Sequence, residues 1–271
     1  MTELIRIVRF AVGAADPDGP GEHANGHGNG HGGFPSARGL DRYFELSVRC
    51  RGELGSQSGY IVNIKVIDDV VRSGAAAVIA RACRDRPDAE PGELMPEILE
   101  TIRRACPAEV SSVTLHLSPY YCVEMEARDR SRVLVRQRFE FAASHRLHVD
   151  HLSDEENLVL FGKCNNPRGH GHNYIVEPCV ECALGEDSRQ PFTLLDLERL
   201  TIACVVEPFD HRNLNLEVDD FGPGGVNPTV ENIARVCYER LAQPIENLGK
   251  GARLRSVTVW ESERTAATYP A

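Results

Sequence analysis

The chain has 271 residues, of which 42% are hydrophobic and 26% charged, and its formal net charge is −10. This length predicts two domains or one large domain, with enough apolar residues for a sizeable core. The negative charge argues against a nucleic-acid-binding protein, which would carry a basic patch. No apolar run approaches the roughly 18–20 residues that span a bilayer, and the N-terminus lacks the apolar stretch of a secretory signal. We therefore expect a cytoplasmic protein with no nucleic-acid or membrane partner, whose nine cysteines are reduced thiols.

The first half of the chain contains two candidate strands, at residues 9–15 and 111–115, and a candidate helix start at residues 94–99. Early in this half, residues 21–33 contain His23, His27 and His31 at intervals of four, and most of the rest is glycine. Glycine loses the most conformational entropy on folding, so we expect a disordered loop here. The alternative is weak metal capture by the three histidines.

The second half has clearer periodicity. Residues 133–141 alternate between apolar and polar side chains, as a strand does, and residues 174–184 and 254–261 are further strand candidates. Residues 194–206 have a mainly helical pattern. Thr229 can cap a helix, and the apolar stripe of that helix would contain Val230, Ile233, Cys237 and Leu241.

The two halves repeat one order of elements. Three pairs of segments carry the repeat: residues 9–15 with 138–144, residues 94–99 with 227–232, and residues 111–115 with 255–259. The order strand, strand, helices, strand is therefore predicted twice, with a junction near residues 129–133. The alternative is a chance similarity between short apolar strands.

The segment that says most about chemistry is GKCNNPRGHGHNY, residues 162–174. In an extended strand, residues two apart point to the same face, so His170 and His172 would present their imidazoles side by side. Together with His145, upstream of the thiol, they would form a three-nitrogen zinc site with an open fourth position, as a catalytic zinc requires. Cys164 would stand near the metal without having to bind it.

Each part of this site is weak evidence when taken alone. A His-x-His pair is common without a metal, and spacing by itself does not bring His145 onto the pair. The nearby thiol and the flanking glycines strengthen the metal interpretation. We expect no zinc at Cys179 and Cys182, because strand positions three apart face opposite ways and no second cysteine pair accompanies them.

Several segments of the second half closely resemble the 6-pyruvoyl-tetrahydropterin synthase family. They follow one another in the family's order: FAASH at 141–145, FGKCNNP at 161–167, GHGHNY at 169–174, FDHRNLN at 209–215, NPTVENIA at 227–234 and VTVWES at 257–262. The resemblance covers the C-terminal half only.

The resemblance implies an α+β fold built from tandem tunnelling-fold (T-fold) domains. Each domain would be an antiparallel four-stranded sheet with two helices on one face, and copies would associate into barrels with active sites between subunits. We expect a degenerate T-fold domain at residues 1–130 and a catalytic one at residues 131–271. A homo-oligomer of three chains would supply six T-fold copies, matching the family's usual hexamer of single domains.

The implied activity is conversion of the pterin 7,8-dihydroneopterin triphosphate to 6-pyruvoyl-tetrahydropterin with loss of triphosphate, a carbon–oxygen lyase reaction. Zn²⁺ at the three histidines would bind side-chain oxygens of the substrate as a Lewis acid. By resemblance, Cys164 is the base, and Asp210 orients His211, which exchanges a proton with the thiol. Glu261 would accept hydrogen bonds from the amino group and ring N–H of the pterin, and Thr229 would combine helix capping with a pterin contact.

The first copy would lack this chemistry. Asp16 falls where His145 does, Gly39 and Asp41 fall where the His-x-His pair does, and Leu117 replaces Glu261. We therefore expect it to act as a scaffold that holds no metal.

Two other functions remain open. The first is 6-carboxy-tetrahydropterin synthase of the queuosine pathway, which would use the same site. The five residues between Cys164 and His170 favour the pyruvoyl branch, because the carboxy branch commonly has a shorter gap. The second is a non-enzymatic zinc module with Cys164 as the fourth ligand, which would have no use for Asp210, His211 or Glu261.

Overall fold

The structure of the chain is a computed structural model that describes residues 1–13 and 40–271. It divides into two units: the first contains residues 1–135 and 182–191, and the second contains residues 136–181 and 192–271. The predicted loop at residues 21–33, with Asp16 and Gly39, lies outside the described residues. The division falls five residues after the predicted junction at 130/131, and residues 182–191 group with the first unit although the prediction placed them in the second domain.

The first unit contains the strands β1, β2, β3 and β4 in that sheet order, each antiparallel to its neighbour, and most of β5 (Arg132–Gln137), which lies next to β4. The first four strands are β1 (Thr2–Val12), β2 (Arg42–Gly52), β3 (Glu109–His116) and β4 (Tyr121–Glu126). Two helical segments separate β2 from β3. They comprise α1 (Ile64–Val70), the π-helical turn η2 (Val71–Ala75) and α2 (Ala76–Asp85), then the 3-10 turn η3 (Pro91–Leu94) and α3 (Met95–Ala105).

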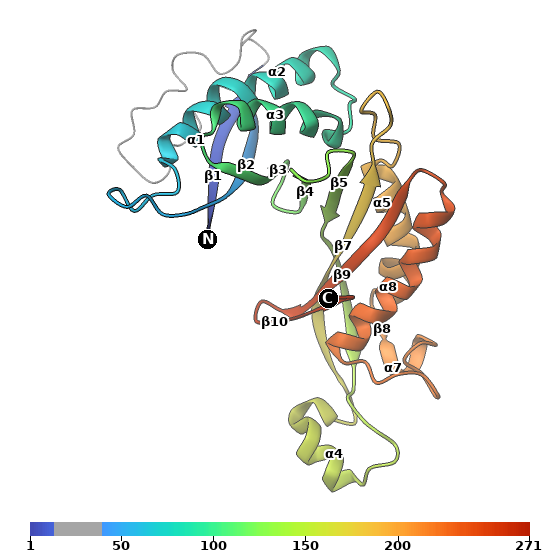
Figure 1. The fold of residues 1–271 in the computed structure, drawn as a ribbon. Coiled ribbons are helices and arrows are strands. Elements are labelled where there is room, and N and C mark those ends of the chain that lie inside the picture. Colours follow the sequence, from blue (N-terminus) through green and yellow to red (C-terminus); the bar gives the residue numbers. More distant parts are fainter. Residues whose placement is uncertain (14–39) are drawn as a thin grey trace. The chain divides into compact units, whose positions relative to one another are not determined.

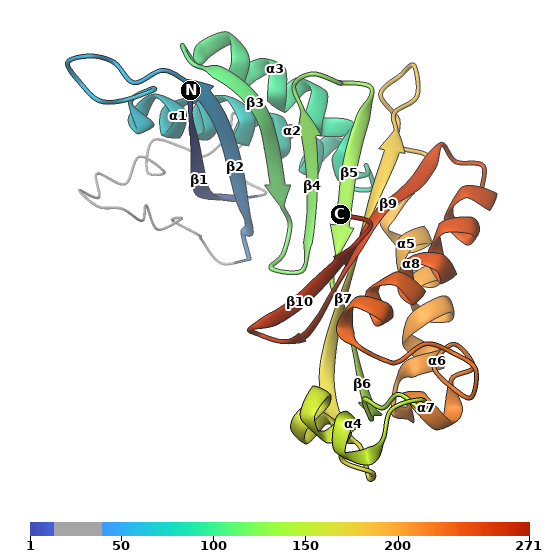
Figure 2. The ribbon, with the colours of Figure 1, turned by 60° about the horizontal axis from the view of Figure 1, so that its bottom comes forward.

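The core of the first unit lies between its sheet and its helices. Along β2, Phe44, Leu46 and Val48 are buried, whereas the residues between them are partly exposed, as expected for a sheet covered on one face. Helices α1, α2 and α3 all lie on that face (Figure 2), and α3 contributes the buried Ile98 and Ile102, four residues apart. The predicted strand 111–115 and the helix near 94–99 are present as β3 and α3.

The second unit has the strands β6 (Phe139–His145), β7 (His170–Ala183), β9 (Ala252–Ser262) and β10 (Thr265–Tyr269) in the order β6-β7-β9-β10, and the short β8 (Arg212–Asn213) adds to the free edge of β6. Its helical elements are α4 (Asp154–Phe161), η4 (Gly162–Asn165), α5 (Leu194–Thr201), η5 (Ile202–Val206), α6 (Glu207–Phe209), α7 (Leu214–Glu217) and α8 (Val230–Asn247). Helices α5 and α8 run along one face of this sheet (Figure 1), and α8 packs on β9 and β10.

Local signals explain the two main helices of the second unit. Thr229 caps α8 by accepting a hydrogen bond from the Asn232 N–H, and the predicted stripe of α8 is buried, so that prediction is confirmed. Thr193 and Asp196 form a capping box at the start of α5. The helix predicted over 194–206 is present, but its second part is the five-residue π-helical turn η5.

Three strand predictions had wrong bounds. The strand predicted over 9–15 is β1, which begins at Thr2 and ends at Val12. The single strand predicted over 133–141 is two strands, β5 (Arg132–Gln137) and β6, that separate at Arg138. No glycine or proline interrupts the alternation there, so strand pairing and not a local signal sets the break. Strand β7 begins at His170, four residues before the predicted start, and therefore includes the His-x-His pair.

Within the described residues, none of the helices combines the length and the apolar character needed to cross a membrane.

Candidate metal centre and active site

Strands β6 and β7 bring the three predicted histidines together. In their antiparallel register His145 lies opposite His170, and Ala143 lies opposite His172. Gly169 makes this approach possible, because it has a φ of 70° and a Cβ there would lie 3.0 Å from the His145 carbonyl oxygen. The candidate ligand nitrogens of the three histidines all lie within 4.8 Å of one another, so these residues can hold a metal ion.

The protein environment keeps His145 neutral and oriented. Its side chain is fully buried, and its Nδ1–H donates to the Pro228 carbonyl oxygen over 2.7 Å, which leaves the Nε2 lone pair for a ligand. Burial lowers the pKa of His145 to about 4, with a smaller contribution from the two neighbouring histidines. Burial also lowers the pKa of His170. Neutral imidazoles are the form that binds metal.

A second observation also indicates that these three histidines can hold a metal ion. His170 Nδ1 and His172 Nε2 are buried, and neither has a hydrogen-bond partner among the described residues. An unpaired buried polar atom is costly, and coordination of His172 Nε2 by a metal would satisfy one of these two nitrogens.

Two further side chains line the same centre. An oxygen of Glu261, near the end of β9, lies 3.5 Å from His145 Nε2 and 3.6 Å from His172 Nε2. The hydroxyl of Tyr174 lies 3.3 Å from His145 Nε2, and its pKa is raised, chiefly by burial and then by the charge of Glu261. Sequence reasoning missed Tyr174, although its position two residues after His172 on one strand face was a usable signal. No sequence pattern indicated that the Pro228 carbonyl group would contact His145.

Asp210 and His211 form a second cluster at the free edge of β6. One Asp210 oxygen accepts the Ala142 N–H over 2.8 Å, and the other accepts the His211 Nδ1–H over 2.7 Å. The His211 N–H in turn donates to the Ala142 carbonyl oxygen over 2.6 Å. These bonds lower the pKa of Asp210 and hold His211 in a left-handed backbone conformation with φ 57°. Because Nδ1 is engaged, His211 presents Nε2 outward on a side chain that is 83% exposed.

A hollow of about 570 Å³ lies beside the second cluster. Its lining includes His172 from the three-histidine centre and His211, with Ser144, Asn173 and Glu217.

Cys164 lies in η4, between α4 and β7, and is partly exposed. Its carbonyl oxygen accepts the Leu147 N–H over 2.9 Å, and the next residue, Asn165, donates from its side chain to the Leu147 carbonyl oxygen over 2.7 Å. The turn carrying the thiol is thus tied to the chain just after His145. Among the described residues, no hydrogen bond or ion pair joins Cys164 to Asp210 or His211, and its sulfur is not in the converging ligand group.

Thr229 directly follows Pro228, the residue that contacts the metal centre. Pro228 supplies the carbonyl oxygen that orients His145, and Thr229 begins α8 directly afterwards. The side chain of Asn232 closes this turn by donating to the Asn227 carbonyl oxygen over 2.8 Å. The predicted helix cap at Thr229 is therefore present, and the segment that contains it lies against the buried imidazole of His145.

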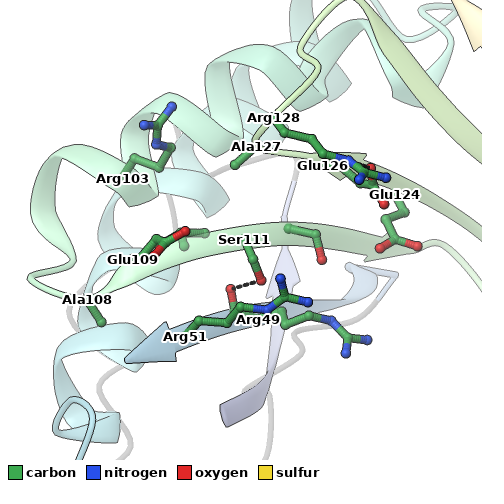
Figure 3. A pocket seen from close by; sticks show the side chains of 12 residues that line it. Arg49, Arg51, Arg103, Ala108, Glu109, Ser111, Glu124, Glu126, Ala127 and Arg128 are labelled. Carbon is green, nitrogen blue, oxygen red and sulfur yellow. Dashed lines mark hydrogen bonds and ion pairs between the residues drawn. The ribbon is translucent and has the colours of Figure 1, made fainter. Parts of the chain in front are cut away.

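The first unit has a hollow of its own, of about 640 Å³, on the strands β2, β3 and β4 (Figure 3). Arginine and glutamate side chains line it, and the Ser111 hydroxyl donates to the Arg49 carbonyl oxygen over 3.2 Å. The guanidinium groups of Arg49 and Arg51 both pair with Glu3. Because these charges are balanced by carboxylates, no ligand is assigned to this hollow.

The fold and the site define an α+β protein with a three-histidine centre that can hold a metal ion. Residues 134–271 match the profile of the family described as 6-pyruvoyl tetrahydropterin synthase. The 6-pyruvoyl tetrahydrobiopterin synthase of Homo sapiens is 39% identical over 140 residues, which cover 52% of this chain and 92% of the human protein. That of Drosophila melanogaster is 33% identical over 133 residues, 49% of this chain and 76% of the fly protein.

A solved structure, that of Caenorhabditis elegans 6-pyruvoyl tetrahydropterin synthase, is 35% identical, covers 51% of this chain and 94% of the worm chain, and has a TM-score of 0.46. The chain belongs to the 6-pyruvoyl tetrahydropterin synthase family. The resemblance inferred from the sequence motifs is thereby confirmed, and the matches cover the half that carries the three histidines.

Proposed function

We propose that the chain is a zinc-dependent 6-pyruvoyl-tetrahydropterin synthase-like enzyme that converts 7,8-dihydroneopterin triphosphate with loss of triphosphate. One observation carries the proposal: His145, His170 and His172 converge beside Glu261 in a chain of the synthase family. Zinc suits the three imidazoles, which would leave a fourth position open for substrate. When bound there, zinc would supply Lewis acidity to oxygens of the substrate side chain, which makes the adjacent carbon-bound protons more acidic.

The residues around this centre would bind and orient the substrate. Glu261 lies within 3.6 Å of two of the ligand imidazoles, so its carboxylate borders the position of the metal. As the family resemblance implies, we propose that it accepts hydrogen bonds from the amino group and ring N–H of the pterin. Thr229, at the start of α8, remains the proposed contact to the pterin ring.

Proton transfer would fall to Cys164, Asp210 and His211. A thiol has a pKa of about 8.5, so Cys164 needs a partner that takes its proton before it can act as a base. Asp210 holds His211 in the tautomer that presents Nε2, which is the nitrogen able to receive that proton. Because no bond joins Cys164 to this pair in the described part of one chain, we propose that the pair comes from a second copy.

Surface chemistry supports association of copies. The helix α4, just before Cys164, exposes three consecutive apolar side chains: Leu158 at 62%, Val159 at 88% and Leu160 at 61%. An exposed apolar cluster of this kind marks a contact surface more often than a solvated one. We propose a homo-oligomer of three chains, in which α4 of one copy brings Cys164 to Asp210 and His211 of another.

We further propose that the first unit, with a domain boundary near 130/131, is a second T-fold copy without the site. Both units run strand, strand, helix, helix, strand, strand, and both have the sheet order first-second-third-fourth. In both, the first helix contains a five-residue π-helical turn, η2 and η5, which is rare enough to indicate common descent.

Stacked aromatic pairs set the alignment of the two copies. Phe10 lies directly opposite Phe44 with ring centroids 5.9 Å apart, and Phe141 lies opposite Tyr174 at 5.1 Å. If these pairs are equivalent, the position of His172 in the first copy is Arg42. This shifts the alignment proposed from sequence by one residue, from Asp41, and an arginine cannot serve as a zinc ligand.

Incubation of the chain with 7,8-dihydroneopterin triphosphate, with and without zinc, tests the proposed activity. Mass spectrometry of the product distinguishes 6-pyruvoyl-tetrahydropterin from the 6-carboxy compound that the rival branch would form. Absence of either product with zinc-loaded protein would refute the enzyme proposal. If Cys164→Ala then also loses zinc, the thiol is a ligand, and the non-enzymatic zinc module is the better interpretation.

Co-expression of the two inactive variants Cys164→Ala and His211→Ala tests the shared site. Random assembly would give both intact groups to about one site in four, so about a quarter of wild-type turnover should return. No recovery, although both variants associate, would place the complete site within one chain. The mass in solution should be near 90 kDa for three chains of 29.9 kDa each.

A further inference from the structure

Two buried cysteines of the first unit face each other across the sheet–helix interface. Cys50 lies in β2 and is fully buried, and Cys106 directly follows α3 and is 7% exposed. Their sulfur atoms are 4.0 Å apart, although the residues are 56 positions apart in sequence. The first unit holds no residue of the proposed active site, so this pair is independent of the proposed function.

The backbone fixes both cysteines. The pairing of β2 with β3 shifts between Arg49 and Cys50, and after this bulge Cys50 lies opposite Val110. Cys106 ends α3, and its N–H donates to the Ile102 carbonyl oxygen over 2.8 Å. The sulfur atoms therefore meet between two regular elements, and the contact is not a chance encounter of mobile loops.

The geometry is close to that of a disulfide. A disulfide needs sulfur atoms about 2.05 Å apart, so the two must approach by about 2 Å, which side-chain rotation with a small backbone shift can supply. The two thiols are also unequal. The hydrogen bond between the two thiols lowers the pKa of Cys106 and raises that of Cys50. Cys106 is also the more exposed of the two residues, so it is the one that an oxidant reaches first.

We propose that Cys50 and Cys106 are a redox-sensitive pair that a hydroperoxide converts to a reversible disulfide. The Cys106 thiolate attacks the peroxide, the O–O bond breaks, and Cys106 becomes a sulfenic acid while the other oxygen leaves as water or alcohol. The Cys50 sulfur then attacks the sulfenic sulfur, the S–S bond forms, and water leaves with the Cys50 proton. The two thiols lose two electrons in total, and the peroxide gains them.

The disulfide would change the stability of the first unit. It would join β2 to the end of α3 and close a loop that contains α1, α2 and α3. A crosslink across a loop of this length restricts the unfolded chain and so favours the folded state. The oxidised first unit should therefore resist heat and proteolysis better than the reduced one.

The experiment uses the full reduced chain, treated with hydrogen peroxide near stoichiometric amounts and then alkylated under denaturing conditions. Proteolytic mapping should find the peptides of Cys50 and Cys106 joined, with a mass 2 Da below the sum of the two reduced peptides. Dithiothreitol should reverse the link. Thermal unfolding should show a Tm at least about 5 °C higher after oxidation.

Matched variants separate this pair from the other thiols. Cys50→Ser and Cys106→Ser should each abolish both the link and the Tm shift, whereas Cys237→Ser, which removes a buried thiol of the second unit, should preserve them. Alkylation of both Cys50 and Cys106 in the oxidised wild type would overturn the proposal. So would stable sulfinic acid at Cys106 without a link. The wild-type mapping decides the matter even if a serine variant does not fold.

Discussion

Loss of one imidazole from the three-histidine centre should weaken zinc binding by about two orders of magnitude. His170→Ala removes the ligand that lies opposite His145, at an Nε2–Nε2 distance of 3.1 Å. Zinc sites with four protein ligands contribute about 10–16 kcal/mol, or about 3 kcal/mol for each ligand. Because 1.4 kcal/mol corresponds to a factor of ten, the zinc Kd should rise by roughly 10². His172→Ala should behave similarly, since its Nε2 lies in the same group.

The assay is competition for zinc against a chromophoric chelator, which gives the Kd of each variant. Far-UV circular dichroism and the Tm show whether the fold persists; both side chains are only partly buried, so we expect that it does. His151→Ala is the matched control, because His151 is an exposed histidine of the same unit outside the ligand group. Its zinc Kd should equal that of the wild type.

Two results would refute the reasoning. If His170→Ala binds zinc with the wild-type Kd, His170 is not a ligand, and the convergence of the three side chains has another cause. If His151→Ala weakens zinc binding as much as His170→Ala, the assay reports a general loss of structure or a surface site.

Three further outcomes are expected. Cys164→Ala should retain zinc but lose turnover by a factor of roughly 10²–10⁴, as for loss of a general base; unchanged turnover would exclude it as the base. Hydrogen bonds from Ala142 and His211 lower the pKa of Asp210, so this carboxylate stabilises the fold above pH 3.8, and that contribution is lost as the pH falls through its lower folded-state pKa. Between pH 5 and 2 the Tm of the wild type should therefore fall more steeply than that of Asp210→Asn, and parallel curves would contradict this. Thr229→Ala removes the cap of α8 and should cost about 1 kcal/mol in chemical denaturation, whereas Thr265→Ala, at an exposed strand end, should cost much less.

Several parts of the fold followed from local sequence signals. The alternation of β5, the capping residue of α8 and the stripe behind it were visible because each is a short-range pattern with one physical solution. The break between β5 and β6 at Arg138 was not visible, because strand pairing sets it and no residue in the alternating run marks it. The π-helical turns had no sequence signal either.

The sequence by itself determined which residues could bind a metal. The His-x-His spacing on a strand requires His170 and His172 to share a face, since strand side chains alternate. The tertiary structure decided the rest. The register of β6 against β7 brought His145 opposite His170, and the approach of α8 supplied the Pro228 carbonyl group that orients the buried imidazole. The end of β9 brought Glu261 against the same histidines. These contacts join residues far apart in sequence, so they depend on strand register and helix packing, which no local pattern encodes.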